Sequence, residues 1–326
     1  MKPGWALHNN GTKLPKWVHR TQETQKAARK IAGVRKAAPR AKAWKNSQDL
    51  KAKMQAANLP AWFLMMVLKV VASVTGPLRY GVEAFSGQGQ LSAAFAKHVG
   101  PWASFEILDD SKHNMLLDSG LKILIAMVLR TCIGGVLWMG TPCKSWVALS
   151  RSFTQRSLAW PEGPPAHLCT ARQHAYLKEH NTLVDRTALL ADLAHCLGIF
   201  FVVEQPLSSI LFHYRPLAQV LAKAEALTIP FRMQNFRGDS VKPLRLKGTG
   251  MWLKTFLEVN ACRQKSAQVK SLKSLVVKDA AGNFTGIAKE LTLSSGYTQS
   301  MGTALAFCYL GMDCADVLKK LQQLDL

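Results

Sequence analysis

Two short loops of this sequence carry side chains that could take part in covalent chemistry. Residues 141–144 (TPCK) follow an apolar segment, and residues 204–206 (EQP) follow the apolar run 199–203 (IFFVV). Cys143 is a candidate nucleophile because the neighbouring Lys144 would stabilise its thiolate, although most lone cysteines are packing residues. A carboxylate at the end of an apolar strand needs a partner. Glu204 is therefore either an acid of raised pKa or half of a salt bridge.

A glycine-rich turn and a later acid could bind a nucleotide-like ligand. Residues 85–89 (FSGQG) place two glycines where they would allow a tight turn and a close approach of the ligand to the backbone. A purely structural turn would look the same. Glu106 lies 17 residues after Gly89, at the end of the next expected strand, where an acid can bind two ribose hydroxyls. Asp109 or Asp110 could do this instead.

The elements that would position these loops alternate between strands and helices. Apolar periodicity predicts helices over residues 61–74, 90–98, 116–130 and 181–197, the last capped by Asn181, and strands over 78–85, 103–108, 135–139 and 199–203, with 157–180 as a surface excursion. This alternation is typical of a doubly wound α/β sheet. Ligands bind such sheets beyond the carboxyl ends of the strands, so we expect the loops to meet in one crevice.

The charge of the chain is strongly positive and unevenly distributed. The 326 residues include 42 Lys and Arg against 20 Asp and Glu, for a formal net charge of +22, and residues 1–60 alone contribute +12. We predict a basic, disordered arm over residues 1–55 and a catalytic domain over residues 56–326. The surplus charge favours a nucleic-acid partner. The arm itself could bind phosphate, direct the protein to the nucleus or merely aid solubility.

Several classes of protein are disfavoured by the composition. The apolar run 61–74 is shorter than the roughly 20 residues that span a bilayer, and Lys69 interrupts it, so we expect no membrane partner. The first 20 residues contain no apolar signal segment. Seven cysteines without a C-x-x-C pair indicate neither a metal cluster nor a disulfide framework, and favour an intracellular, reducing compartment.

Taken in order, the glycine turn, the strand-end acid, the Pro-Cys loop and the Glu-x-Pro loop resemble the motifs of the cytosine-5 DNA methyltransferases. The resemblance covers roughly residues 78–310 and implies a Rossmann-like fold that uses S-adenosylmethionine. It implies that Cys143 adds to the pyrimidine ring and that Glu204 contacts the base. It also implies a cofactor site that contains Phe85, Ser86, Gly87, Gly89, Glu106 and Pro142.

Two segments further along the chain resemble later motifs of this family. In residues 242–245 (KPLR), Arg245 matches the arginine that supports the Pro-Cys loop, and residues 297–306, including Gly302, match the segment that closes the cofactor pocket. Lys144 and Gln205 depart from the Gln and Asn usual in the family. The acid expected on the third strand is not obvious, since Asp118 is a poor candidate. Only about residues 253–296 remain for target recognition, so that region is reduced.

The expected function is transfer of a methyl group from S-adenosylmethionine to cytosine in DNA, in the nucleus. RNA is an alternative substrate, because the tRNA-modifying branch of the family uses the same cysteine and glutamate. A catalytically silent nucleic-acid-binding module is a second hypothesis, and an unrelated α/β enzyme with a coincidental Cys143 is a third. Arg151, Arg156 and Arg172 could hold phosphates at the rim. We expect no metal, and the sequence leaves the oligomeric state open.

Overall fold

The computed structural model describes residues 6–7, 13–14, 47–239, 242–266, 276–278, 284–286 and 296–324. Most of the predicted disordered arm therefore lies outside the described residues. Within it, β1 (Ala6–Leu7) pairs with β2 (Lys13–Leu14) in an antiparallel register.

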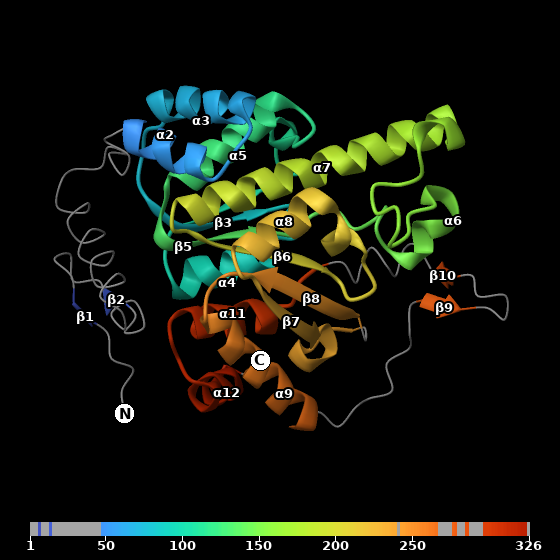
Figure 1. The fold of residues 1–326 in the computed structure, drawn as a ribbon. Coiled ribbons are helices and arrows are strands. Elements are labelled where there is room, and N and C mark those ends of the chain that lie inside the picture. Colours follow the sequence, from blue (N-terminus) through green and yellow to red (C-terminus); the bar gives the residue numbers. More distant parts are fainter. Residues whose placement is uncertain are drawn as a thin grey trace.

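A mixed six-stranded sheet forms the centre of the molecule and confirms the α/β class (Figure 1). Its spatial order is β4-β3-β5-β6-β8-β7. The strands are β3 (Arg79–Ala84), β4 (Trp102–Phe105), β5 (Thr131–Met139), β6 (Phe200–Pro206), β7 (Leu227–Arg232) and β8 (Pro243–Gly248). The first four run parallel to one another, and β8 runs antiparallel to both β6 and β7.

Helices cover both faces of the sheet (Figure 1). One face carries α2 (Ser47–Ala56), α3 (Ala61–Ser73), α5 (Asp118–Leu129), α7 (Ala171–Cys196) and α8 (Arg215–Lys223), and the other carries α4 (Gln90–His98), α9 (Trp252–Ser266), α11 (Gln299–Tyr309) and α12 (Cys314–Gln323). The strands alternate accordingly: Leu137 and Met139 join the first core, while Val136 and Trp138 join the second. Each layer thus has its own apolar core.

Shorter elements connect this framework. They are α6 (Arg151–Thr154), the strand pair β9 (Val276–Lys278) and β10 (Phe284–Gly286), and the 3-10 helices η3 (Ser111–His113), η4 (Ala148–Ser150), η5 (Ala166–Leu168), η6 (Leu211–His213) and η7 (Met233–Phe236). The strand β10 lies beside η4, at the same end of the molecule as α6 (Figure 1).

The order of the strands reverses between β3 and β5. From β3 the chain crosses to the edge strand β4 and then returns to the opposite side of β3 to form β5. In open α/β sheets a crevice opens at the carboxyl ends of the two strands that flank such a reversal. The turn 85–89 follows β3 and the loop 140–143 follows β5, so the two loops flank the position where this crevice is expected, and the Gly140 N–H donates to the Ala84 carbonyl at 3.0 Å.

Helix α7 differs most from the sequence-based expectation. It begins at Ala171 rather than at residue 181, and Thr170 caps it through a reciprocal capping box with Gln173. The predicted cap Asn181 lies inside the helix, so that prediction was wrong, and only the first part of the excursion 157–180 is irregular. The charged and His-containing sequence of the first turns lacks the apolar stripe on which the prediction relied.

The core begins earlier in the chain than the predicted boundary at residue 56. Helix α2 occupies residues 47–56, and its Leu50 and Met54 side chains are completely buried. The four-residue spacing of these side chains puts them on one face of a helix, although the segment around them is basic. At the other end, Leu253, Phe256 and Val259 of α9 are completely buried, so the first third of the presumed recognition region belongs to the core.

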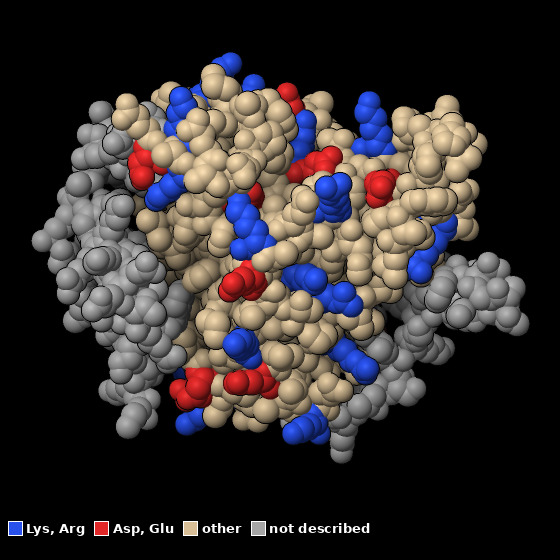
Figure 2. Space-filling model, in the orientation of Figure 1, with Lys and Arg blue, Asp and Glu red and all other residues tan. Residues whose placement is uncertain are grey.

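The charged side chains of the described surface are dispersed and do not form one basic patch on the face shown in Figure 2. Figure 2 shows Lys and Arg side chains distributed over the visible face, with acidic side chains among them. Across the described ranges, no helix is both long enough and apolar enough to cross a membrane.

Candidate functional site

The glycine turn after β3 has an open side. Phe85, Gly87 and Gly89 all adopt positive φ angles, of 60°, 53° and 65°, and Gly89 is the N-cap residue of α4. A Cβ atom built on Gly87 or Gly89 would have no heavy atom within 4 Å. The glycines therefore serve the backbone conformation rather than close packing, and they leave space where a ligand could approach main-chain N–H groups.

Glu106 lies beside this turn, as the sequence predicted. The backbone N–H of Gly87 donates to Glu106 Oε2 at 2.9 Å, and that of Leu108 donates to Oε1 at 3.3 Å. The Ser86 and Ser104 hydroxyls lie 2.5 Å apart and join the turn to β4. These hydrogen bonds tie the glycine turn to Glu106 and to β4.

A second acid near the turn was missed by the sequence reasoning. Glu83 lies on β3 and is completely buried, and its Oε2 accepts hydrogen bonds from the backbone N–H and the hydroxyl of Ser92 at 2.8 and 2.5 Å. Its Oε1 has no partner among the described residues. Burial raises the pKa of Glu83 to about 7, and the nearby charge of Glu106 adds to the increase. An acid inside the largely apolar segment 78–85 was the sequence feature that could have predicted a buried carboxyl group.

The Pro-Cys loop follows β5 and is held tightly. The backbone N–H of Trp146 donates to the Cys143 carbonyl at 2.9 Å, and the Thr141 and Thr187 hydroxyls lie 3.0 Å apart. Pro142 and Cys143 are half-buried. Burial raises the pKa of the Cys143 thiol, the charge of Glu204 raises it further, and Lys242 lowers it.

Glu204 lies at the end of β6, where it is buried. The Tyr297 hydroxyl donates to Glu204 Oε2 at 3.0 Å and accepts from Trp138 Nε1 at 3.1 Å, while Glu204 Oε1 has no partner among the described residues. Burial raises the pKa of Glu204, against the opposing effects of Lys242 and the Tyr297 hydrogen bond. The sequence placed Tyr297 at a helix start but did not link it to this acid.

Gln205 joins the Pro-Cys loop to the segment that carries Glu204. Its amide Nε2 donates to the Thr141 carbonyl at 2.5 Å, and its Oε1 accepts from the Ser209 hydroxyl at 2.9 Å. Gln205 therefore has a structural role, because it links the end of β6 to the Pro-Cys loop. Arg245 pairs with Gln205 across β6 and β8, and its guanidinium donates to the Leu207 carbonyl at 3.1 Å. Arg245 was expected to support the Pro-Cys loop, but its guanidinium instead contacts the segment that follows β6.

The last predicted segment meets the glycine turn, but not through Gly302. A Cβ atom on Gly296 would lie 2.8 Å from Gln88 Oε1, and one on Gly140 would lie 3.1 Å from the Tyr297 hydroxyl. A Cβ atom on Gly302 would instead lie 2.9 Å from the Ala94 Cβ. Gly302 thus allows α11 to pack closely against α4, and the residues just before α11 are the ones beside the turn.

Arg156 was expected to be a rim residue, and that expectation was wrong. Its side chain is only 2% exposed, and its guanidinium carbon lies 3.6 Å from the centre of the Trp146 ring. The guanidinium donates to the Pro161 carbonyl at 2.5 Å and to Asn181 Oδ1 at 2.9 Å. Burial lowers the pKa of Arg156 to about 10. Arg156 therefore braces the segment behind Cys143, while Arg151 and Arg172 are exposed.

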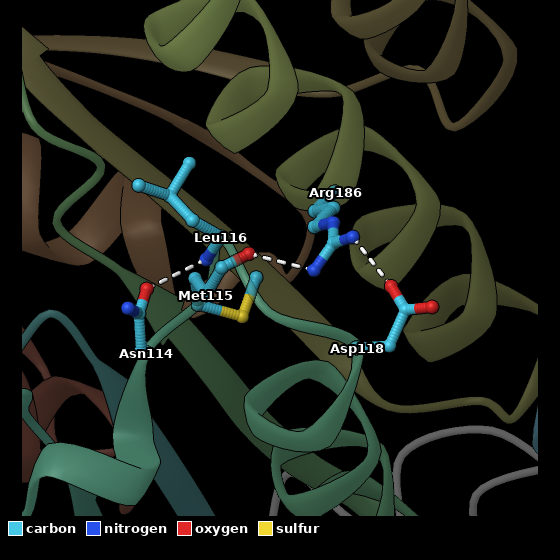
Figure 3. A network of polar contacts seen from close by, with 5 residues as sticks. All are labelled: Asn114, Met115, Leu116, Asp118 and Arg186. Atoms are coloured by element: carbon cyan, nitrogen blue, oxygen red, sulfur yellow. Dashed lines mark hydrogen bonds and ion pairs between the residues drawn. The ribbon is translucent and has the colours of Figure 1, made fainter.

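Asp118 belongs to a separate polar network (Figure 3). Arg186 of α7 lies between the Met115 carbonyl, at 2.9 Å, and Asp118 Oδ1, at 2.6 Å, and Asn114 accepts from the Leu116 N–H. The network fastens α7 to the start of α5. These contacts give Asp118 a structural partner and agree with its weakness as a cofactor-binding candidate.

Neither protein-family models nor curated proteins match this sequence. Among the described residues, no group of three or more His, Cys, Asp or Glu side chains is placed to hold a metal ion. The resemblance to cytosine-5 methyltransferases therefore stays a prediction, which depends on the motifs and on the geometry of the three loops.

Proposed function

We propose that this protein is a cytosine-5 methyltransferase that transfers a methyl group from S-adenosylmethionine to cytosine in a nucleic acid. DNA is the first candidate substrate and RNA the second. The proposal includes the doubly wound, Rossmann-like fold of such enzymes and, because of the basic N-terminal segment, a nuclear location. Its main support is geometric: Gln205, next to the buried Glu204, donates its amide N–H to the Thr141 carbonyl and so joins the end of β6 to the loop that carries Cys143.

The residues around the glycine turn fit the cofactor. The open space at Gly87 and Gly89 admits a ligand to the backbone, and Glu106 offers a carboxylate at the same place. Phe85 and Pro142 come from the two loops that flank the crevice. When bound, S-adenosylmethionine supplies an electrophilic methyl group carried on a sulfonium.

The Cys143 and Glu204 side chains would activate the base. Carbon 5 of cytosine is a weak nucleophile, and addition of the Cys143 thiolate at carbon 6 gives it enamine character. The raised pKa of Glu204 favours its protonated form, which can donate a hydrogen bond to ring nitrogen 3 as charge develops there. After methyl transfer, loss of the carbon-5 proton allows the Cys143 sulfur to leave and restores the ring.

A catalytically silent nucleic-acid-binding module is the second candidate. The raised pKa of the Cys143 thiol favours it, because a protonated thiol is a poor nucleophile. Lys242 and Lys144 act in the opposite direction, since their charges lower that pKa. The two candidates share the fold and the cofactor site and differ only in the covalent step.

Covalent trapping separates the two candidates. The protein is incubated with labelled S-adenosylmethionine and DNA or RNA that contains 5-fluorocytosine, in which carbon 5 carries no removable proton. An active enzyme forms a stable adduct, seen as a labelled band on a denaturing gel. Cys143→Ala should abolish the adduct, while Cys196→Ala, at the far end of α7, should leave it unchanged.

Two other outcomes would decide against the enzyme. If the cofactor binds but neither nucleic acid gives an adduct, the silent module is correct. If calorimetry detects no binding of S-adenosylmethionine at all, both candidates fail, because both use the turn at Gly87 and Gly89.

A further inference from the structure

Large apolar side chains are exposed on α6 and on the segment between α6 and α7. Phe153, Leu158, Trp160 and Leu168 are 41%, 66%, 48% and 55% exposed, and we call these four residues the apolar patch. In Figure 2 the surface over α6 and the start of α7 is mostly neutral, with separate basic side chains among it. Concentrated apolar exposure of this kind is typical of a binding surface.

The segment that carries the patch is held by buried polar contacts. Gln173 Nε2 donates to the Phe153 carbonyl at 2.7 Å, and Asn181 Nδ2 donates to the Glu162 carbonyl at 3.0 Å. Arg156 adds its bond to the Pro161 carbonyl. These bonds fix the backbone, so the aromatic rings can bind a partner without a large loss of conformational entropy.

The patch is connected to the candidate site. Arg156 stacks on the Trp146 ring, and the backbone N–H of Trp146 donates to the Cys143 carbonyl. At the other end of α6, the Arg151 guanidinium lies 3.5 Å from the Ser208 carbonyl in the loop that follows Glu204. A nucleic-acid strand bound along the patch would therefore lead toward Cys143 and Glu204.

The charges around the patch favour a polyanion. Between residues 144 and 180 the exposed cations are Lys144, Arg151, Arg172 and Lys178, and the exposed acids are Glu162 and Glu179, which leaves a net charge of +2 on the exposed side chains. Exposed aromatic rings next to cations are the elements with which proteins bind single-stranded nucleic acids, because bases stack on the rings and phosphates contact the cations.

We propose that the apolar patch binds single-stranded nucleic acid beside the target base, with bases stacked on Phe153 and Trp160 and phosphates near Arg151 and Arg172. This inference depends on the proposed function, and it names the form of the substrate as an unpaired strand. An unpaired strand also avoids the cost of extracting the target base from a duplex.

The experiment uses the full-length protein and compares variants that remove an aromatic ring from the patch with a control variant that removes an exposed tryptophan elsewhere. A fluorescein-labelled single-stranded pyrimidine 12-mer and its duplex are titrated by anisotropy against wild type, Phe153→Ala, Trp160→Ala and Trp62→Ala. Trp62 on α3 is 52% exposed and serves as the control. We expect each patch variant to bind the single strand about ten-fold more weakly, with a smaller change for the duplex, and Trp62→Ala to match wild type.

Unchanged single-strand binding in Phe153→Ala and Trp160→Ala would overturn the inference, and would leave the patch to a protein partner. A normal adduct in the trapping experiment would show that the proposed function survives this failure. If wild type binds no nucleic acid at all, both fail together. The Phe153 ring packs edge-on against Tyr176, so Trp160→Ala is the cleaner variant, and circular dichroism checks that each variant keeps the wild-type thermal transition.

Discussion

The two sides of the crevice differ in how open they are. At the glycine turn, the positions of Gly87 and Gly89 face free space, and both oxygens of Glu106 accept backbone hydrogen bonds. At the Pro-Cys loop the side chains are closely packed. Five of its neighbours have a buried polar atom with no hydrogen-bond partner among the described residues, and they are Ser145, Trp146, Arg156, His180 and Glu204.

The turn therefore has free space beside its backbone at Gly87 and Gly89, whereas the surroundings of Cys143 are closely packed. Buried polar atoms without partners are costly, and such atoms near a reactive group are satisfied when the local structure changes or a substrate enters. Burial also holds the Cys143 thiol in its protonated form. We infer that cofactor binding requires little rearrangement and that attack by Cys143 requires the base to be present.

The largest expected effect concerns Glu83, a completely buried acid beside the glycine turn. Burial raises the pKa of Glu83 from 4.5 to about 7, so the folded state favours the protonated carboxyl. Its contribution to stability is complete below pH 4.5 and is lost as the pH rises to about 7, a change of about 3 kcal/mol. Glu83→Gln should therefore equal wild type at pH 4 and exceed its free energy of unfolding by about 3 kcal/mol at pH 8.

Urea unfolding at each pH measures this difference. The glutamine keeps an amide oxygen that can accept from Ser92. The substitution therefore removes the ionisable group while leaving these hydrogen bonds in place. If the two proteins show the same pH dependence, Glu83 is ionised in the folded protein, and the open side then holds a buried negative charge.

Much of the framework could be predicted from the sequence because it depends on local patterns. Strands β3 and β5 end at Ala84 and Met139, and each is a short apolar run followed by a loop, as predicted. The loop predicted at residues 204–206 is instead the end of β6 (Phe200–Pro206), where these residues pair with β8. The alternation of strands and helices then brings the three loops to one edge of the sheet. Cys143 and Glu106 consequently follow strands β5 and β4, whereas Glu204 lies within β6, and the roles of all three stay predictions.

The contacts that tune the site could not be predicted in the same way, because they join residues far apart in the chain. Tyr297 reaches Glu204 across 93 positions, and Gln205 reaches Thr141 across 64. Arg156 looks like any surface arginine in the sequence, and only the stacking against Trp146 buries it. Helix α7 was predicted too short because its first turns are polar.

The next prediction tests the open side directly. Gly87→Ala places a methyl group in the free space beside the turn, and Gly134→Ala does the same at the start of β5, far from the crevice. Both glycines have positive φ angles, of 53° and 78°, and both face free space. Both variants should lose about 1–2 kcal/mol of stability from backbone strain. Only Gly87→Ala should also weaken S-adenosylmethionine binding, by about ten-fold, or about 1.4 kcal/mol.

Calorimetric titration with the cofactor separates these contributions, since the Gly134 variant reports the strain alone. Equal affinities in the two variants would mean that the ligand does not approach the backbone at Gly87. The comparison between the two sides of the crevice would then lose its main support.

The smallest expected effect concerns the closed side, where charge tunes the thiol. Glu204→Gln removes the negative charge that raises the pKa of Cys143, so the pH midpoint for alkylation of Cys143 by iodoacetamide should fall. The decrease should stay below about one pKa unit, because burial raises the pKa of Glu204 too and keeps part of it uncharged. Peptide mass spectrometry follows the modification at Cys143 alone.

Substitution of Lys242 removes a positive charge near the same thiol and should have the opposite effect. Its charge lowers the pKa of the thiol, so Lys242→Gln should move the alkylation midpoint upward. Opposite movements in the two variants would show that the thiol responds to both charges in the closed state. If neither variant moves the midpoint, burial alone controls the thiol. Activation of Cys143 would then depend on opening of the loop rather than on the charges beside it.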